Sequence, residues 1–503
     1  MSSHSPIMKR LLFPLSLLFL LLLLFSPAGF SQEQGWSQPL RLGDGWFPDI
    51  VADTSGQLHL VYASALGDSA NYAGYDVVMY TTSQDGMKWS APLDIGARPQ
   101  NSGSEVTRPY LITDRANNLH MTYRDTTVFY AQVPIPLAAQ AGNWSLKAIN
   151  QGYFSVIGID SRGRYHLAYT DNVVTDQCPI CYHLFYTYSD NSGQSWSSPT
   201  DVSSLPTGSA KPQMIIDEQD NLYLFWEAGT GGSYGQLVDP TIVLFSFSTD
   251  HGVTWSLPSQ LSPPGERARH PGMGLDGEQN LVVVWLDPQT DEVYYRVSRE
   301  RGRNWTATTT ISGIWGGWGV YPGRLDHYVM AIDSLGHLHL VLVGRTSTSQ
   351  QSLDLLHLVW DGEGWSAPEI IASFYGDVPE WPEIAIANGN ELHVTWFIRP
   401  EAYIWSGGFG SQVWYAHRTL DAPRFEQVLL PTLTPAPTPT AAASLAEPTP
   451  EPLSDAAAQA EELAFYGDIT TENDEVLLIL QSVLPVLLFI GLSTTVIRRL
   501  QRP

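Results

Sequence analysis

Cysteine is almost absent from this chain of 503 residues. The two cysteines, Cys178 and Cys181, stand together in a Cys-Pro-Ile-Cys segment. A structural zinc site needs four ligands, and no second cysteine pair supplies the other two. We therefore interpret the pair as a small loop disulfide or as free thiols, and we expect no bound metal.

Charge is scarce too, and most of it is negative. Charged residues make up 15% of the chain, with 26 Lys and Arg against 51 Asp and Glu, and the formal net charge is −25. This balance excludes a nucleic-acid partner, because binding to phosphates requires clustered Lys and Arg. The sequence also shows no Ser-His-Asp arrangement, nucleotide-binding loop or basic stripe, so we expect no cofactor.

Long hydrophobic runs are missing except near the two ends. Lys9 and Arg10 precede an uncharged run over 11–25 and then small residues up to Ser31. This order is typical of a secretory signal peptide, here residues 1–31. A retained N-terminal membrane anchor is the alternative, although the run is shorter than the roughly 20 residues that a membrane span needs.

The C-terminal run predicts a single membrane anchor. Residues 476–497 carry no charge, and three arginines follow them. A transmembrane helix over 475–497 and a cytoplasmic tail over 498–503 agree with the positive-inside rule. The segment 431–474, which begins rich in Pro, Thr and Ala, is predicted to be an extended stalk. The main domain, 32–430, would then face outward from the cell membrane.

Glycine and tryptophan are plentiful, with 42 and 17 copies, and both recur in one repeated turn. In the segment 248–255, Ser248 and Asp250 can bond to the amides of the turn, Gly252 can take a positive φ, and Trp255 forms an apolar plug. Related segments occur at Ser189 to Trp196, Ser298 to Trp305, Ser83 to Trp89 and Asp361 to Trp365.

A second phrase recurs seven times, at a period of roughly 45 to 60 residues that is typical of propellers. Its copies begin at Pro48, Pro109, Phe154, Pro212, Pro271, Tyr328 and Pro382. Each predicts two apolar strands joined by an Asp or Gly turn; a third strand follows, and the Trp turn leads into a fourth. The sequence thus predicts an all-β, seven-bladed β-propeller, with six or eight blades as alternatives.

The ring also needs a closing strand, because closure leaves fewer unpaired edges. We expect Gly35–Leu42 to pair with the last blade. Arg424–Leu430 competes for the same place.

These repeats resemble the sialidase-like, Asp-box (bacterial neuraminidase repeat) family, over about Trp36 to Leu430. The resemblance implies that the Trp turns are structural and lie away from the face that binds sugar. It also implies a glycan or glycoconjugate ligand. We expect the chain to act as a monomer.

Candidate ligand-binding residues lie in the loops before the first strand and after the second strand of each unit, which alternating strand direction places on one face. Both charge signs and aromatic residues are enriched there, as in a pocket for an acidic or hydroxyl-rich ligand. The alternative interpretation is a solvated rim of paired charges. The candidates are Trp46, Arg108, Arg124, Asp125, Tyr153, Asp171, Lys211, Glu227, Arg269, His270, Asp287, Asp326, His327, Arg345, Glu380, Trp381 and Arg399.

The resemblance further implies roles in catalysis, since sialidases hold a sugar carboxylate with three arginines and use a tyrosine nucleophile. Arg108 and Pro109 resemble the family's Arg-Ile-Pro element without its isoleucine, and Asp125 is the acid/base candidate. Arg269 and Arg345 would be the other arginines, and Tyr321 and Tyr403 are the tyrosines considered for the nucleophile. Two functions therefore stay open: a glycan-binding propeller that hydrolyses glycosidic bonds, and a non-catalytic module that recognises carbohydrate or protein.

Two further sets of repeated residues are interpreted as structural. One histidine occupies the same strand position in five units, which spreads the set around the ring, so these are predicted to be packing residues and not ligands. Aspartates that end the first strands are predicted to form turns with local amides. The sets are His59, His120, His166, His339 and His393, and Asp53, Asp114, Asp160, Asp217, Asp276 and Asp333.

Overall fold

A computed structural model describes residues 35–66, 74–99, 107–125, 127–174, 181–203, 207–230, 238–321, 325–403 and 410–425. The chain divides into two units, 1–429 and 430–503, and every described residue belongs to the first. None of the helices in the described ranges is both long and apolar enough to cross a bilayer. The predicted segments 1–31, 431–474, 475–497 and 498–503 lie outside these ranges.

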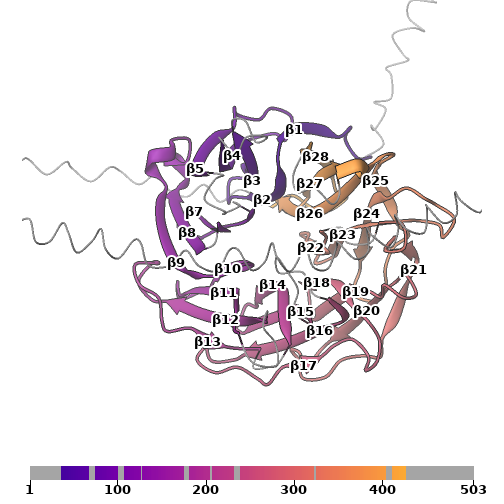
Figure 1. Ribbon diagram of the computed structural model, residues 1–503. Helices are drawn as coiled ribbons and strands as arrows, with labels where there is room; N and C mark the ends of the chain where they lie inside the picture. The colour runs from indigo at the N-terminus through magenta and orange to yellow at the C-terminus, as the bar shows by residue number, and fades with distance from the viewer. Residues whose placement is uncertain are drawn as a thin grey trace, which may run out of the picture. The chain divides into compact units, whose positions relative to one another are not determined.

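The described chain is a seven-bladed all-β propeller, in which each blade is an antiparallel sheet of four strands (Figure 1). Blade 1 comprises β2 (Trp46–Ala52), β3 (Leu58–Leu66), β4 (Tyr75–Ser83) and β5 (Leu93–Pro99). Blade 2 comprises β6 (Thr107–Thr113), β7 (Asn118–Arg124), β8 (Thr127–Pro134) and β9 (Ser145–Gln151). Blade 3 comprises β10 (Ser155–Ile159), β11 (Tyr165–Asn172), β12 (Tyr182–Ser189) and β13 (Thr200–Asp201).

The remaining blades repeat this order. Blade 4 comprises β14 (Gly208–Ile216), β15 (Leu222–Thr230), β16 (Val238–Ser248) and β17 (Ser259–Gln260). Blade 5 comprises β18 (Arg269–Leu275), β19 (Leu281–Leu286), β20 (Glu292–Ser298) and β21 (Thr309–Trp315). Blade 6 comprises β22 (Val329–Ile332), β23 (Leu338–Gly344), β24 (Asp354–Trp360) and β25 (Glu369–Ser373). Blade 7 comprises β26 (Asp377–Ala387), β27 (Glu391–Pro400), β28 (Gln412–Thr419) and β1 (Leu40–Asp44).

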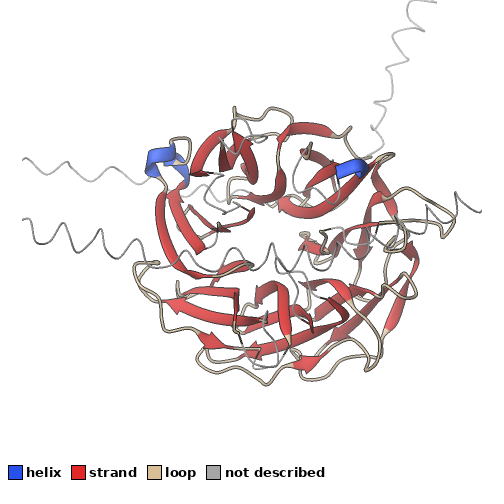
Figure 2. Ribbon diagram, viewed as in Figure 1, coloured by secondary structure: helices blue, strands red, loops and turns tan. Residues whose placement is uncertain are grey.

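The first strand of each blade lies innermost, and neighbouring innermost strands pack side by side around the ring. The described helices are single 3₁₀ turns, η3 (Ile135–Leu137), η4 (Ala141–Asn143) and η6 (Glu401–Tyr403), so strands and loops dominate Figure 2. The second strands are mostly buried, and β19 and β23 are buried along their whole length. Both faces of such a strand meet a neighbouring blade, which explains why these runs do not alternate.

The N-terminal strand closes the ring, as predicted. β1 pairs with β28, where Leu40 lies opposite Tyr415, and the Ser37 amide donates to the His417 carbonyl at 2.8 Å. The last blade is therefore built from both ends of the domain. The competing segment begins with Arg424 and Phe425, which bind near the β26–β27 turn, and its residues 426–430 lie outside the described ranges.

Each Trp turn fastens its blade to the preceding one. The Ser248 hydroxyl accepts from the Gly252 amide at 2.9 Å, and the Asp250 carboxylate accepts from the Thr254 amide at 2.9 Å. The ring of Trp255 packs edge-on against Tyr186 of blade 3, with centroids 4.9 Å apart. The same contact recurs between Trp89 and Tyr415, Trp196 and Tyr130, Trp305 and Phe245, and Trp365 and Tyr295.

The repeated histidines and aspartates support these turns from inside the blades. His59, His120, His166, His339 and His393 are buried, and four of them hydrogen-bond a tyrosine on the third strand at 2.7–2.9 Å. Burial lowers the pKa of His166 to about 4 and that of His393 to about 3, so both rings are neutral at pH 7. Asp53 accepts from the amides of Ser55 and Gln57. The packing and turn roles predicted for both sets are thus confirmed.

Replacing Gly252 with alanine should destabilise the propeller more than the same change at Gly163. Both glycines have positive φ, 80° and 83°, but an added Cβ at Gly252 would overlap the Tyr186 hydroxyl, whereas at Gly163 it would meet nothing within 4 Å. We expect a loss of about 1 kcal/mol for Gly163→Ala from backbone strain, and roughly 1–3 kcal/mol more for Gly252→Ala from overpacking. Urea unfolding followed by tryptophan fluorescence measures both, and equal losses would contradict the clamp between blades.

Candidate functional site

The innermost strands of five blades begin with the same bulge. In each, a residue with positive φ precedes a proline, and the register with the second strand shifts there. Such a bulge changes the direction of a side chain relative to a regular strand. The five residues are Phe47 (φ 49°), Arg108 (φ 53°), Lys211 (φ 51°), His270 (φ 52°) and Trp381 (φ 52°). Four of them are predicted site residues, and Phe47 was missed by the sequence analysis.

These bulges stand at one end of a cavity that the innermost strands enclose. The cavity has a volume of about 590 Å³. Arg108, Lys211, His327 and Trp381 line it, and Asp49, Tyr110, Gln213 and Glu383 follow one or two residues further along their strands. We call the end with the bulges the mouth. A polar mouth over a partly apolar cavity is the usual form of a small-ligand site.

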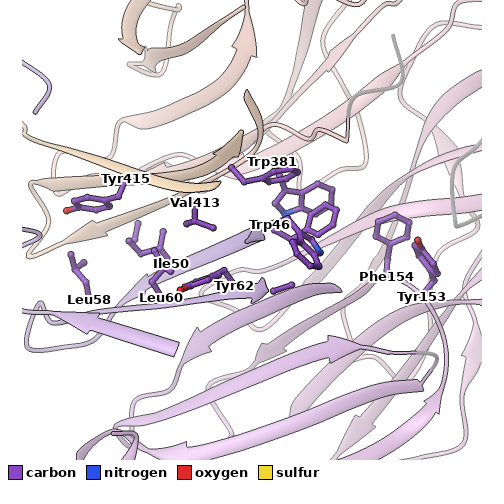
Figure 3. Packing of buried hydrophobic residues seen from close by; sticks show 14 of the residues in the cluster. Trp46, Ile50, Leu58, Leu60, Tyr62, Tyr153, Phe154, Trp381, Val413 and Tyr415 are labelled. Carbon is purple, nitrogen blue, oxygen red and sulfur yellow. The ribbon is translucent and has the colours of Figure 1, made fainter. Parts of the chain in front are cut away.

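Arg108 lies inside a group of aromatic rings contributed by blades 1, 3 and 7. Its Cζ atom is 4.5 Å from the ring centroid of Phe47, 4.7 Å from those of Tyr153 and Phe154, and 5.9 Å from that of Trp381. Figure 3 shows Tyr153 beside Phe154, and Trp46 close to Trp381. Each ring face attracts the cation. Arg124 joins this group, with its Cζ 3.8 Å from the Tyr153 centroid.

A second cationic group joins blades 4, 5 and 6 at the mouth. The Nζ atom of Lys211 lies 3.2 Å from Oε2 of Glu227 and donates to the Asp326 carbonyl at 2.8 Å. Arg269 Nη1 is 3.8 Å from the other oxygen of Glu227, and its Cζ lies 4.7 Å from the Trp318 ring. Two cations thus share one buried carboxylate. Burial lowers the pKa of Lys211, and Arg269 lowers it further while Glu227 opposes this.

Other predicted residues are held in local pairs. Asp125 Oδ2 binds Arg98 Nε at 2.6 Å, and the two oxygens of Glu380 accept from Arg399 at 2.6 and 2.7 Å. Arg345 pairs with Asp291 and donates to the carbonyls of Thr348 and Gln350, and its backbone pairs with Trp315 on the outer strand of blade 5.

The structure therefore does not gather the three arginines proposed from the resemblance at one point. Arg108 lines the cavity, Arg269 belongs to the second group, and Arg345 binds the outer strand of the blade beside it. Tyr321 packs against a core cluster, and burial with nearby Glu401 raises its pKa. The side chain of Tyr403 lies outside the described part of the chain.

The remaining candidates are not among the residues that line the cavity. Trp46 is buried in the core between blades 7 and 1. The Asp287 carboxylate accepts from the Gln289 amide at 2.7 Å, so it caps its own turn. His270 lies 3.7 Å from Asp326 through Nδ1, and its ring packs against Trp318 and Tyr328. Asp171 is partly exposed, and burial raises its pKa. Cys181 is disulfide-bonded, and Cys178 lies outside the described residues.

Two buried carboxyl groups below the mouth were missed by the sequence analysis. Asp49 accepts from the amides of Ile50 at 2.7 Å and Leu111 at 2.6 Å, and Glu383 Oε1 lies 2.8 Å from His327 Nε2. Burial raises the pKa of both acids well above the ordinary range, and Glu383 raises that of Asp49 further. Each follows the proline of a bulge, which was the available sequence signal.

Histidine and acid in this cavity are both kept neutral. Burial lowers the pKa of His327 to about 4. Its Nε2 atom also lies 3.1 Å from the Pro382 carbonyl. A carbonyl only accepts, so Nε2 carries the proton. The cavity thus holds an uncharged imidazole beside carboxyl groups that retain protons at higher pH than free acids do, and such groups can act as general acids.

No protein-family model and no curated protein matches this sequence. Solved structures do match over about three quarters of the chain. A variant of the NanB sialidase from Streptococcus pneumoniae is 13% identical, with a TM-score of 0.43 over 76% of this chain and 70% of that one. The intramolecular trans-sialidase from Ruminococcus gnavus is 12% identical, with a TM-score of 0.42 over 76% and 96%.

A polysaccharide lyase also matches. This ulvan lyase is 10% identical, with a TM-score of 0.48 over 75% of this chain and 95% of that one. The structural neighbours thus include sialidases and a polysaccharide lyase. At these identities the chemistry of the mouth has to be argued from the side chains of this chain alone.

The Glu383→Gln variant should gain stability relative to the parent as pH rises. The folded state holds the Glu383 proton at higher pH than the unfolded state, so the parent loses stability when pH rises above the ordinary glutamate range toward the raised pKa. Glutamine keeps an oxygen for His327 and carries no charge. Thermal unfolding of the full chain between pH 4 and 8 should show that the difference in unfolding temperature between variant and parent grows as pH rises.

Glu363→Gln is the matched control, because Glu363 lies on an exposed turn. Its pH profile should follow that of the parent. A Glu383→Gln profile parallel to the parent at every pH would contradict a raised pKa at Glu383.

Proposed function

We propose that the mouth of the propeller binds an acidic glycan, with the chain acting as an exported carbohydrate-recognition protein. The observation that supports this is the lining of the cavity, where Arg108 and Lys211 stand beside Trp381. Cationic side chains bind the carboxylate or sulfate of a sugar, and an indole face packs against its ring. The chain has only 26 Lys and Arg among 503 residues. Two of these few cations, Arg108 and Lys211, line the cavity, which supports a role for them in binding.

The export part of the proposal comes from the two ends of the chain. A signal peptide over 1–31 and an anchor over 475–497 would present the propeller on the outer side of the membrane, with 431–474 as a stalk. The high acid content suits a surface outside the cell. A monomer is sufficient, because the cavity is enclosed by the seven blades of one chain.

Hydrolysis of the bound glycan is the second candidate, and the carboxyl groups in the cavity favour it. A general acid must hold a proton at the pH of the reaction, and burial favours this role by raising the pKa of Glu383 and Asp49 well above the ordinary range. Asp125 fits this role less well because its carboxylate is bound by Arg98. The binding function needs no reaction at all and is our leading proposal.

Arg108→Lys and Lys211→Met should both weaken binding of an acidic saccharide. Lysine retains the charge of Arg108 and loses the planar fork that stacks on rings and binds carboxylates in pairs. Loss of a charge-assisted hydrogen bond costs about 1.5–3 kcal/mol, or roughly 10- to 150-fold in affinity. The measurement is a glycan array with uronic, sialic and sulfated sugars, followed by titration calorimetry. Arg162→Met, at an exposed turn on the other side of blade 3, is the control and should bind like the parent.

Binding of neutral sugars as tight as that of acidic ones would contradict the proposed role of the cations. Absence of binding to every glycan would favour a protein ligand instead. Thermal unfolding of each variant checks that the substitution has not destabilised the fold.

Hydrolysis has its own test with fluorogenic glycosides and acidic oligosaccharides. We expect the Glu383→Gln variant to lower any turnover by roughly 100-fold or more while retaining binding, as loss of a general acid does. If the Glu383→Gln variant keeps the turnover of the parent, another residue is the general acid. Binding without any turnover would leave recognition as the function.

A further inference from the structure

A cluster of two aspartates and two histidines lies between blades 3 and 4, at the end of the propeller opposite the mouth. Asp160 and His166 belong to blade 3, where Asp160 closes the turn between β10 and β11. Asp220 lies in the equivalent turn of blade 4, between β14 and β15, and His251 belongs to the Trp turn of that blade. Four side chains with nitrogen or oxygen donors thus meet across one blade interface.

The distances within the cluster suit a single cation. One donor atom each from Asp160, Asp220 and His251 lie within 4.8 Å of one another, and this is the one such group among the described residues. Nδ1 of His251 is 3.1 Å from Oδ2 of Asp160, and Nε2 of His166 is 3.5 Å from the same oxygen. Ligands on a tetrahedral ion with bonds of about 2.0–2.1 Å stand roughly 3.3 Å apart.

His166 provides a second observation at the cluster. Its side chain is completely buried, its Nδ1 bonds the Tyr186 hydroxyl at 2.7 Å, and its Nε2 has no hydrogen-bond partner. That nitrogen points toward Asp160. Buried polar atoms are satisfied in the great majority of cases, so a buried ring nitrogen that faces Asp160 at 3.5 Å without a hydrogen bond calls for an explanation.

We propose that Asp160, Asp220 and His251 form a binding site for one divalent transition-metal ion of the zinc class, with His166 facing Asp160 behind it. An imidazole beside two carboxylates matches zinc, whereas calcium and magnesium prefer oxygen donors alone. Nδ1 of His166 would donate to Tyr186, which fixes the orientation of the ring. Both aspartates already accept hydrogen bonds, Asp160 from the amides of Arg162 and Arg164 and Asp220 from Ser161. A carboxylate oxygen with a second lone pair can still bind an ion.

The surroundings allow an ion to enter. A cavity of about 330 Å³ is lined by Asp160, His251, Asp190 and Asp250, together with Arg162 and Arg164. Arg164 is the nearest competing cation, and it is bound in a fork by Asp190 at 2.7 and 3.1 Å. Its charge is therefore largely compensated, while Asp160 and Asp220 supply the charge for the ion.

The interpretation of the repeated histidines as packing residues holds in the other blades, because each carries only part of this arrangement. In blade 2, His120 and Asp114 form the same pair at 3.0 Å. In blade 6, Asp333 is met by His339 at 3.3 Å and by His337 at 3.6 Å. Among the described residues, neither pair has a third donor side chain that brings all the donor atoms within 4.8 Å of one another. Among the described residues, only blade 4 brings both a histidine, from its Trp turn, and an aspartate, from its β14–β15 turn, to the preceding blade's pair.

The test uses cobalt(II) as a spectroscopic probe of the full-length chain freed of metal with a chelator. We expect one equivalent of cobalt to bind with the intense visible absorption of a tetrahedral site, to be displaced by zinc, and to be unaffected by excess calcium. Zinc should also raise the unfolding temperature, since it binds the folded state across a blade interface. A chelator should reverse that rise.

His251→Gln and Asp220→Asn should each lower the cobalt affinity by at least about tenfold and abolish the tetrahedral spectrum. His337→Gln is the matched control, because His337 also approaches a turn aspartate, and it should bind cobalt like the parent. Absence of stoichiometric binding by the parent chain would overturn the proposal. So would a tetrahedral spectrum that survives in both His251→Gln and Asp220→Asn. Neither outcome bears on the glycan at the mouth.

Discussion

The packing of each Trp turn on an aromatic ring of the preceding blade is the contact on which the propeller depends. A blade buries its two faces only against its neighbours, so the angle between blades is set by what fills the wedge between them. Here the wedge holds a tryptophan, a glycine that permits close approach, and a tyrosine or phenylalanine on the third strand, as with Trp255, Gly252 and Tyr186. The buried histidine behind the tyrosine fixes its hydroxyl. The contact always runs in one direction, from a Trp turn to the third strand of the preceding blade, and the last blade receives it from the first through Trp89 and Tyr415.

The same repetition explains why the mouth can be irregular. The outer contacts hold the blades in place, so the innermost strands can bear bulges with non-glycine residues at positive φ, which cost stability wherever they occur. Arg108 and Trp381 occupy such positions, and the bulges place them beside the cavity. The bulges therefore add strained residues at the cavity to those with positive φ in the turns, such as Asn117 and Asp220.

Electrostatics divides the mouth into parts with different properties. Around Arg108, the faces of Phe47, Tyr153 and Phe154 lie against the guanidinium group. Around Lys211, one carboxylate is shared by two cations. Deeper in the cavity, burial raises the pKa of Asp49 and Glu383 and lowers that of His327. Burial thus disfavours charge on the groups below the mouth. Taken with the metal site proposed at the opposite end, the two ends of the propeller offer opposite charge to a ligand.

The sequence by itself determined the strand class and the repeat. It favoured seven blades over six or eight, and closure by the N-terminal strand over the competing segment 424–430. These predictions follow from local chemistry. A turn segment with Gly252 and Trp255, or an apolar run such as Leu281–Leu286, indicates a turn or a strand from its own residues alone. It also placed Arg108, Lys211 and Trp381 on one face from strand alternation alone. Only the tertiary structure decided which charges are paired, because Arg98 reaches Asp125 and Asp291 reaches Arg345 from distant parts of the chain. The carboxyl groups of Asp49 and Glu383, and the meeting of His251 with Asp160, depend likewise on neighbouring blades. Local patterns encode the blade, and the contacts between blades arise only when the ring is closed.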